Sequence, residues 1–164
     1  MKRYDLIDWT TEPHYPYVPF RRGNAETDIQ NQAILPRINI KVPGSIYEAL
    51  QSAGMIEDPF FEMNSLKAQW VANHWWEYRT KIELHPTGKR LELVLEGIDY
   101  KGHVFFNGQK LGVSENMYVP FVYDVTDIAR DGENNVSVVI ENAPNEIGQI
   151  GYTSMVTTQK ARFN

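Results

Sequence analysis

Carboxylates are the most numerous groups in this sequence that could do acid–base chemistry, with 21 aspartates and glutamates among 164 residues. Hydrolysis of a glycosidic bond with retention of configuration would need two of them facing each other, about 5 to 5.5 Å apart. Spacing along a predicted strand does not establish such a pair. The glutamates on polar strand faces, where glutamate is normally solvated, are Glu77, Glu83, Glu92 and Glu96. We therefore assign no catalytic residue.

The other side chains with ligating or nucleophilic chemistry are scattered along the sequence. The four histidines form neither an HxH motif nor an i, i+4 pair, and the chain has no cysteine. They are His14, His74, His85 and His103. The sequence has no GxSxG motif, and "GIDYKG" (97–102) has the character of a turn, not of a phosphate-binding loop. We expect no metal site and no cofactor.

Aromatic rings offer a second kind of site, because exposed rings stack on the apolar faces of sugars. In "WWEYRTKIEL" (75–84), strand periodicity places Trp76 on an apolar face with Tyr78, Thr80, Ile82 and Leu84. Trp75 falls on the opposite face with Glu77, Arg79, Lys81 and Glu83. Trp75 is thus the candidate sugar-binding residue, although contact with a neighbouring domain explains an exposed indole equally well. Trp9 and Trp70 are expected to pack in the core or at an interface.

Further short strands are predicted before and after residues 75–84. Alternation of apolar and polar residues predicts further strands at 34–42, 91–96, 118–125 and 134–143. Asn107-Gly108 lies between two short apolar runs, which predicts a two-residue hairpin. At least six closely spaced strands, without helices between them, indicate an all-β antiparallel sandwich.

One short helix is expected after the first of these strands. Ser45 and Glu48 have the spacing of a capping box, and Gly54 marks the end of the helix. The predicted buried stripe is Ile46, Ala49, Leu50 and Ala53. Residues 55–75 should form a connection that wraps the sheet, and the proline-rich residues 1–33 a lead-in that packs on the domain.

Composition excludes several classes of protein. The net charge of −5 without a basic stripe argues against nucleic acid and anionic lipid as partners. The sequence also has no apolar run of the length that a membrane span needs and no signal-peptide core near its start. These features leave the compartment open between cytoplasm and a secreted or periplasmic location. The final "YTSMVTTQKARFN" has an extended pattern without a turn or cap, which suggests a fragment.

Four segments resemble the amino-terminal sugar-binding domain of glycoside hydrolase family 2, and in particular its β-mannosidase branch. They are "VPGSIYEALQSAGMIEDPFFEMN" (42–64), "WVANHWWEYRTKIEL" (70–84), "LVLEGIDYKGHVFFNGQKLG" (93–112) and "NMYVPFVYDVTDIARDGENNVSVVIENA" (116–143). The resemblance implies a jelly-roll, galactose-binding-domain-like sandwich at 34–164. The start of the chain departs from the branch, because "ILPRINIK" stands where a tryptophan-containing strand is usual.

The resemblance also implies that catalysis belongs to a different domain of the parent chain. In the family, the catalytic glutamates belong to a (β/α)8 barrel downstream, so this domain alone should be inactive. The β-mannosidase branch has a tryptophan-aspartate-tryptophan motif, for which Gln159, Lys160 and Ala161 resemble the lead-in. We therefore expect an accessory domain of a retaining exo-β-glycosidase, β-mannosidase-like or β-galactosidase-like, with carbohydrate and other domains of the parent chain as partners. An autonomous carbohydrate-binding module built on Trp75 and a pure scaffold are the alternatives.

Overall fold

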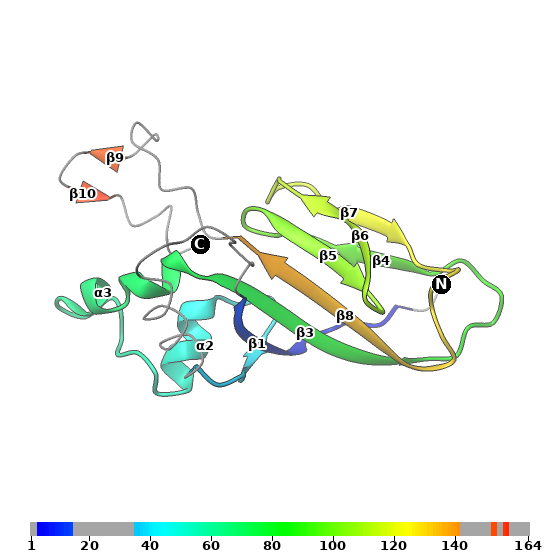
Figure 1. Ribbon diagram of the computed structural model, residues 1–164, viewed down its shortest axis with the longest axis horizontal. Coiled ribbons are helices and arrows are strands. Elements are labelled where there is room, and N and C mark those ends of the chain that lie inside the picture. The colour runs from blue at the N-terminus through cyan, green and yellow to red at the C-terminus, as the bar shows by residue number, and fades with distance from the viewer. Residues whose placement is uncertain (1–2, 15–34, 142–151, 154–155, 158–164) are drawn as a thin grey trace, which may run out of the picture.

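The computed structural model describes residues 3–14, 35–141, 152–153 and 156–157. These residues form three antiparallel sheets, two of which pack as a sandwich (Figure 1). The larger sheet contains, in spatial order, β2 (Ile38–Lys41), β1 (Asp8–His14), β3 (Trp75–Leu84), β8 (Gly132–Ile140), β5 (Gly102–Phe106) and β6 (Gln109–Ser114). The smaller sheets pair β4 (Glu92–Leu95) with β7 (Phe121–Asp124), and β9 (Tyr152–Thr153) with β10 (Val156–Thr157). The predicted all-β sandwich is confirmed.

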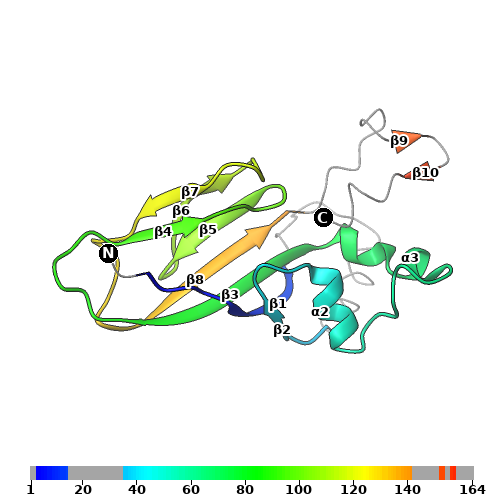
Figure 2. The ribbon, with the colours of Figure 1, turned by 180° about the vertical axis from the view of Figure 1, so that it is seen from behind.

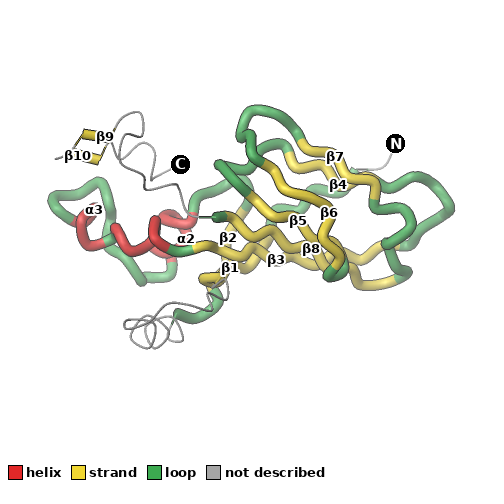
Figure 3. Tube along the Cα trace, turned by 45° about the horizontal axis from the view of Figure 1, so that its top comes forward, coloured by secondary structure: helices red, strands yellow, loops and turns green. Residues whose placement is uncertain are grey.

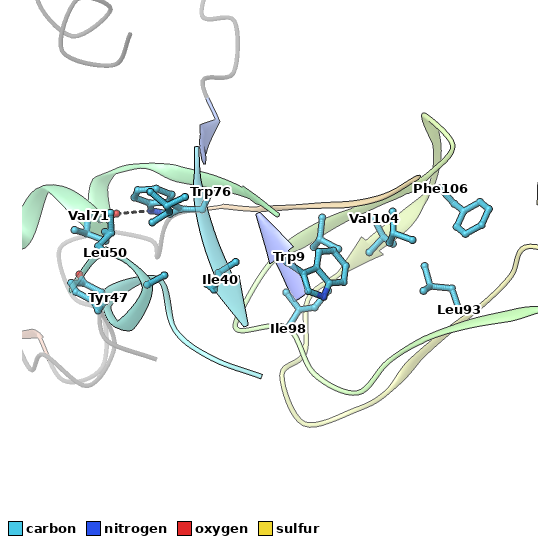
Figure 4. Packing of buried hydrophobic residues seen from close by; sticks show 14 of the residues in the cluster. Trp9, Ile40, Tyr47, Leu50, Val71, Trp76, Leu93, Ile98, Val104 and Phe106 are labelled. Atoms are coloured by element: carbon cyan, nitrogen blue, oxygen red, sulfur yellow. Dashed lines mark hydrogen bonds between the residues drawn. The ribbon is translucent and has the colours of Figure 1, made fainter. Parts of the chain in front are cut away.

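The inner face of the six-stranded sheet is covered by different elements at its two ends. The β4–β7 pair covers the β5 and β6 end, whereas α2 (Ile46–Ser52), α3 (Asn64–Lys67) and η1 (Gln69–Asn73) gather at the β1 and β2 end (Figures 2 and 3). One continuous core joins the two ends (Figure 4). Trp76 contacts the helical end of this core, and Leu93, Val104 and Phe106 fill the sandwich end.

Helix α2 begins at the predicted cap. The Ser45 side chain accepts a hydrogen bond from the Glu48 backbone N–H at 3.2 Å, which satisfies one of the free donors of the first turn. Ala49 and Leu50 are buried as predicted, together with Tyr47. Ala53 does not belong to the buried stripe, because the helix stops at Ser52 and Ala53 is its exposed C-cap. Within the described ranges, no helix has the length and apolar character that a membrane span would need.

The predicted hairpin at Asn107-Gly108 is confirmed, and a glycine lets the two sheets approach closely. Both turn residues have positive φ, +50° and +80°, as a tight two-residue turn between β5 and β6 requires. At Gly112, on the inner face of β6, a Cβ atom would lie 2.9 Å from the ring of Tyr123 in β7. A side chain at position 112 would therefore require the Tyr123 ring to move.

Strand β1 departs from the expectation for the start of the chain. The proline-rich residues 1–33 are expected to form a lead-in over the domain, yet residues 8–14 form a strand between β2 and β3. Buried and exposed side chains alternate at the start of this strand, since Trp9 and Thr11 are buried while Asp8 is exposed. Pro13 is accommodated because it lies near the end of the strand. Residues 15–34, which contain the other two prolines, lie outside the described part of the chain.

Thr11→Val is expected to stabilise the domain by about 1 kcal/mol. Thr11 is 1% exposed, and among the described residues its hydroxyl has no hydrogen-bond partner, so removing it relieves a desolvation cost. Chemical denaturation of the two proteins would measure the gain. The matched control is Thr10→Val, because the Thr10 hydroxyl donates to the Arg79 carbonyl at 3.3 Å and its loss should not stabilise. Equal effects of the two substitutions would contradict this account of Thr11.

Candidate functional site

The candidate residue Trp75 is the first residue of β3 and lies on the outer face of the six-stranded sheet, as predicted. It is half-buried, because two imidazole rings stack against it. His14, its register partner on β1, has its ring centroid at 6.2 Å, and His103 on β5 lies at 5.9 Å. The strand order β1-β3-β8-β5 places these histidines on opposite flanks of the indole. We call this region, with the charged groups around it, the Trp75 face.

The β5 flank of the Trp75 face carries a chain of charged groups. The imidazole Nε2 of His103 lies 2.7 Å from Glu141 Oε1, and the Lys110 ammonium lies 3.1 Å from His103 Nδ1. Lys101 Nζ contacts Glu141 at 3.5 Å and Glu115 at 3.1 Å. Both carboxylates on this flank, Glu115 and Glu141, therefore contact Lys101.

On the β1 flank, the carboxylates contact arginines instead of lysines. Glu77 Oε2 lies 3.5 Å from His14 Nδ1, and its carboxylate accepts two hydrogen bonds from Arg79, each of 2.8 Å. Arg79 also contacts Glu12 at 3.4 Å, and Glu12 pairs with Arg37 at 2.7 Å. Burial alone would raise the pKa of Glu77, but the hydrogen bonds and charge of Arg79, with a smaller effect of His14, lower it below its ordinary value.

Glu77→Gln should destabilise the domain at neutral pH by about 1 kcal/mol and have little effect in acid. A carboxylate with a lowered folded-state pKa contributes stability above its unfolded pKa, and this contribution is lost as the pH falls through the folded value. Urea unfolding of both proteins at several pH values between about 7 and 2 tests this. Glu83→Gln, an exposed position on the same face of β3, is the control and should change little throughout. A deficit that persists undiminished in acid would exclude the ion pair as its cause.

The geometry limits what the Trp75 face can do chemically. A sugar ring stacks on an open aromatic face, whereas imidazoles lie against both flanks of this indole. A general acid for glycoside cleavage needs a raised pKa, and the pKa of Glu77 is lowered. Within the described residues, no group of three or more histidine, aspartate or glutamate side chains is placed to hold a metal ion.

The other three tryptophans lie in the interior or against it. Trp9 is 6% exposed and donates its indole N–H to the Leu6 carbonyl at 2.7 Å. Trp76 is also 6% exposed, and Trp70 packs against it with ring centroids 6.3 Å apart. The predicted packing roles of these residues are confirmed. Gln159, Lys160 and Ala161 lie outside the described residues.

Sequence reasoning missed His14, His103 and Glu141 as parts of one cluster. Their spacing in the chain carries no signal, because they come from β1, β5 and the residue after β8. Strand alternation could have placed His103 on the outer face, opposite Val139. The contact with Trp75 depends on the strand order, which alternation does not encode.

Comparison with known proteins identifies the domain. The family model described as "Glycosyl hydrolase 2 galactose-binding domain-like" matches residues 20–159. A probable β-mannosidase of Caenorhabditis elegans is 38% identical over 106 residues, which are 62% of this chain and 12% of that protein. The β-mannosidase of Rattus norvegicus is 30% identical over 93 residues, covering 55% of this chain and 11% of the relative. The chain thus spans about an eighth of the length of these relatives.

Solved structures show the same relationship. The β-D-mannosidase of Dictyoglomus thermophilum superposes with a TM-score of 0.69 and 26% identity, over 87% of this chain and 16% of that one. A Bifidobacterium dentium β-glucuronidase gives a TM-score of 0.52 at 22% identity, over 82% of this chain and 19% of that one, which shows a shared fold only. The chain therefore belongs to the glycosyl hydrolase 2 galactose-binding-domain-like family, whose sandwich it shares with β-mannosidases.

Proposed function

We propose that this domain is the non-catalytic accessory sandwich of a retaining, exo-acting β-mannosidase-like glycoside hydrolase, in which it forms a wall beside the sugar site. The observation that carries the proposal is the likeness to the Dictyoglomus thermophilum β-D-mannosidase, which extends over 87% of the chain. The matched region is only 11–16% of the mannosidases compared above. The catalytic carboxylates are accordingly assigned to another part of a longer protein.

The carboxylates of this domain support a non-catalytic role. Glu12 and Glu77 are directly opposed across β1 and β3, but Arg79 lies between them. Glu92 and Asp124 are opposed across β4 and β7, and Arg90 contacts both, at 3.1 and 3.0 Å. In each pair, one arginine thus contacts both carboxylates. Hydrogen bonds from Thr126, followed by the charge of Arg90, lower the pKa of Asp124, which is the opposite of what a general acid needs.

Large exposed apolar side chains support contact with another domain of a longer chain. Between α2 and η1, the exposed fractions are 88% for Phe60, 60% for Phe61, 63% for Met63 and 49% for Leu66. Apolar residues gathered in this way are typical of surfaces that bind protein. We assign this segment and the Trp75 face to contacts with neighbouring domains, which would hold the sandwich beside the sugar site.

An autonomous carbohydrate-binding module is the alternative function. It would use Trp75 as a stacking platform, and the half-exposed indole among polar side chains is the feature in its favour. The imidazoles on both flanks leave less of the ring available to a sugar, so we favour the accessory role.

Assays on the isolated 164-residue chain test the proposal. We expect no turnover of an aryl β-mannoside and at most millimolar binding of mannose and short manno-oligosaccharides by isothermal titration. Turnover would overturn the accessory role. Tight binding that is abolished in Trp75→Ala, with unchanged melting temperature, would establish the binding-module alternative. Tight binding that survives this substitution would contradict both the weak binding expected of an accessory domain and the use of Trp75 as a stacking platform.

A further inference from the structure

We propose that His103 is a proton-controlled switch on the Trp75 face, which holds Lys110 when its imidazole is neutral and releases it when the imidazole is protonated. Among the described residues, the groups that face the ring are Lys110 on β6, Glu141 after β8 and Trp75 on β3, and Lys101 before β5 contacts the same Glu141 carboxylate. The switch requires only these contacts within the domain. It therefore does not depend on the enzyme activity proposed above.

The contacts of His103 define its neutral tautomer. An ammonium group can only donate hydrogen bonds, so the Lys110 contact at 3.1 Å requires Nδ1 to be an unprotonated acceptor. A carboxylate can only accept, so the Glu141 contact at 2.7 Å requires a proton on Nε2. Both ring nitrogens of neutral His103 are thus satisfied, with Nε2–H as the single donor.

Protonation of the ring affects these contacts in opposite directions. A proton on Nδ1 would point at the ammonium, so two donors of like charge would face each other at 3.1 Å. Lys110 is exposed and can turn into solvent. Glu141 gains a charge-assisted hydrogen bond, and the indole, with its centroid at 5.9 Å, gains a cation–π contact. His103 therefore keeps its place while Lys110 leaves.

Protonation of His103 changes the net charge of the Trp75 face. Among the described residues around the Trp75–histidine stack, four carboxylates are balanced by four cations: Glu12, Glu77, Glu115 and Glu141 against Arg37, Arg79, Lys101 and Lys110. Histidine is the side chain that changes charge between about pH 5 and 8. His14, 3.5 Å from Glu77, is a second imidazole on the other flank of the indole. Protonation of these rings adds positive charge to the Trp75 face, which then suits an anionic partner surface.

Imidazole ¹⁵N NMR of the whole chain tests the tautomer, with His103→Gln used to assign the signal among the four histidines. We expect the Nε2–H form where the ring is neutral, and protons on both nitrogens where the ring is charged. Crystal structures at the alkaline and acid ends of this titration should show Lys110 Nζ within hydrogen-bond distance of Nδ1 only at the alkaline end. An Nδ1–H tautomer at high pH, or a Lys110 contact that survives in acid, would overturn the switch.

Tryptophan fluorescence gives an independent readout, because a protonated imidazole quenches an indole stacked against it. Acidification should lower the emission of the wild-type chain, less that of His103→Gln, and least that of the double variant His14→Gln/His103→Gln, in which His74 still lies beside Trp70 and Trp76. His85→Gln is the control, since His85 pairs with Asp131 at 2.8 Å beyond the end of β3, and it should behave as the wild type. Quenching of undiminished size in the double variant would contradict protonation next to Trp75.

Discussion

Replacing Trp76 by alanine is expected to lower the free energy of unfolding by about 3–5 kcal/mol. The side chain is 6% exposed and lies against Leu50, Val71 and Trp70, where the sheet meets the helical end of the core (Figure 4). Its indole N–H also donates to the Val71 carbonyl at 3.0 Å. The substitution removes both the apolar contacts and this donor, so a cavity remains and the Val71 carbonyl keeps only the His74 backbone N–H, at 3.4 Å. Urea denaturation monitored by circular dichroism would measure the loss.

Two further variants show how the loss of stability in Trp76→Ala should be interpreted. Trp75→Ala removes an indole from the opposite face of the same strand, where it contacts mainly imidazoles, and should cost about 1 kcal/mol. Trp76→Phe keeps most of the packing but removes the indole donor to the Val71 carbonyl, which then keeps only the His74 backbone N–H. This change should cost about 1 kcal/mol and provides a folded variant if alanine is too damaging. Equal losses for Trp75→Ala and Trp76→Ala would contradict the assignment of the two faces.

Alternation and capping predicted much of the fold, because each depends on neighbouring residues alone. The period of two assigned Trp76 and Leu84 to the interior and Trp75 to the outside, and the structure confirms these positions. Ser45 and the Asn107-Gly108 turn are also confirmed, since a helix cap and a tight turn are defined within four residues. The resemblance supplied the family, which the family model confirms over residues 20–159.

Features that depend on tertiary pairing were not predicted. Strand β1 is short and contains Pro13, so its propensity is weak, and it is held by hydrogen bonding to strands on both sides. The surroundings of Trp75 come from β1, β5, β6 and the end of β8, and no local pattern places these strands next to one another. The role of Trp75 in sugar binding remains a prediction for the experiments above.

Asn134→Asp is the second substitution for which we expect a large loss, about 3–5 kcal/mol at neutral pH. Asn134 is 0% exposed, and its carboxamide is fully hydrogen-bonded. Its Oδ1 accepts from the Arg130 backbone N–H and from the Asn107 side chain, each at 2.8 Å. Its Nδ2 donates to the carbonyls of Arg130 and Gly132, at 2.8 and 2.9 Å. Asn134 thus ties the turn before β8 to the β5–β6 hairpin.

Aspartate has the same shape but places an oxygen where the two carbonyls need a donor, and it adds a buried negative charge. Protonation of the new carboxyl restores one donor, so the deficit relative to wild type should be smaller at about pH 4 than at about pH 7. Thermal and urea unfolding at both pH values would measure the two differences. Asn135→Asp, at the next, exposed position and opposite Lys81, is the matched control and should change stability by no more than about 0.5 kcal/mol. If Asn134→Asp were as mild as this control, the turn would not depend on the Asn134 amide donor, and the buried network would have to be reassigned.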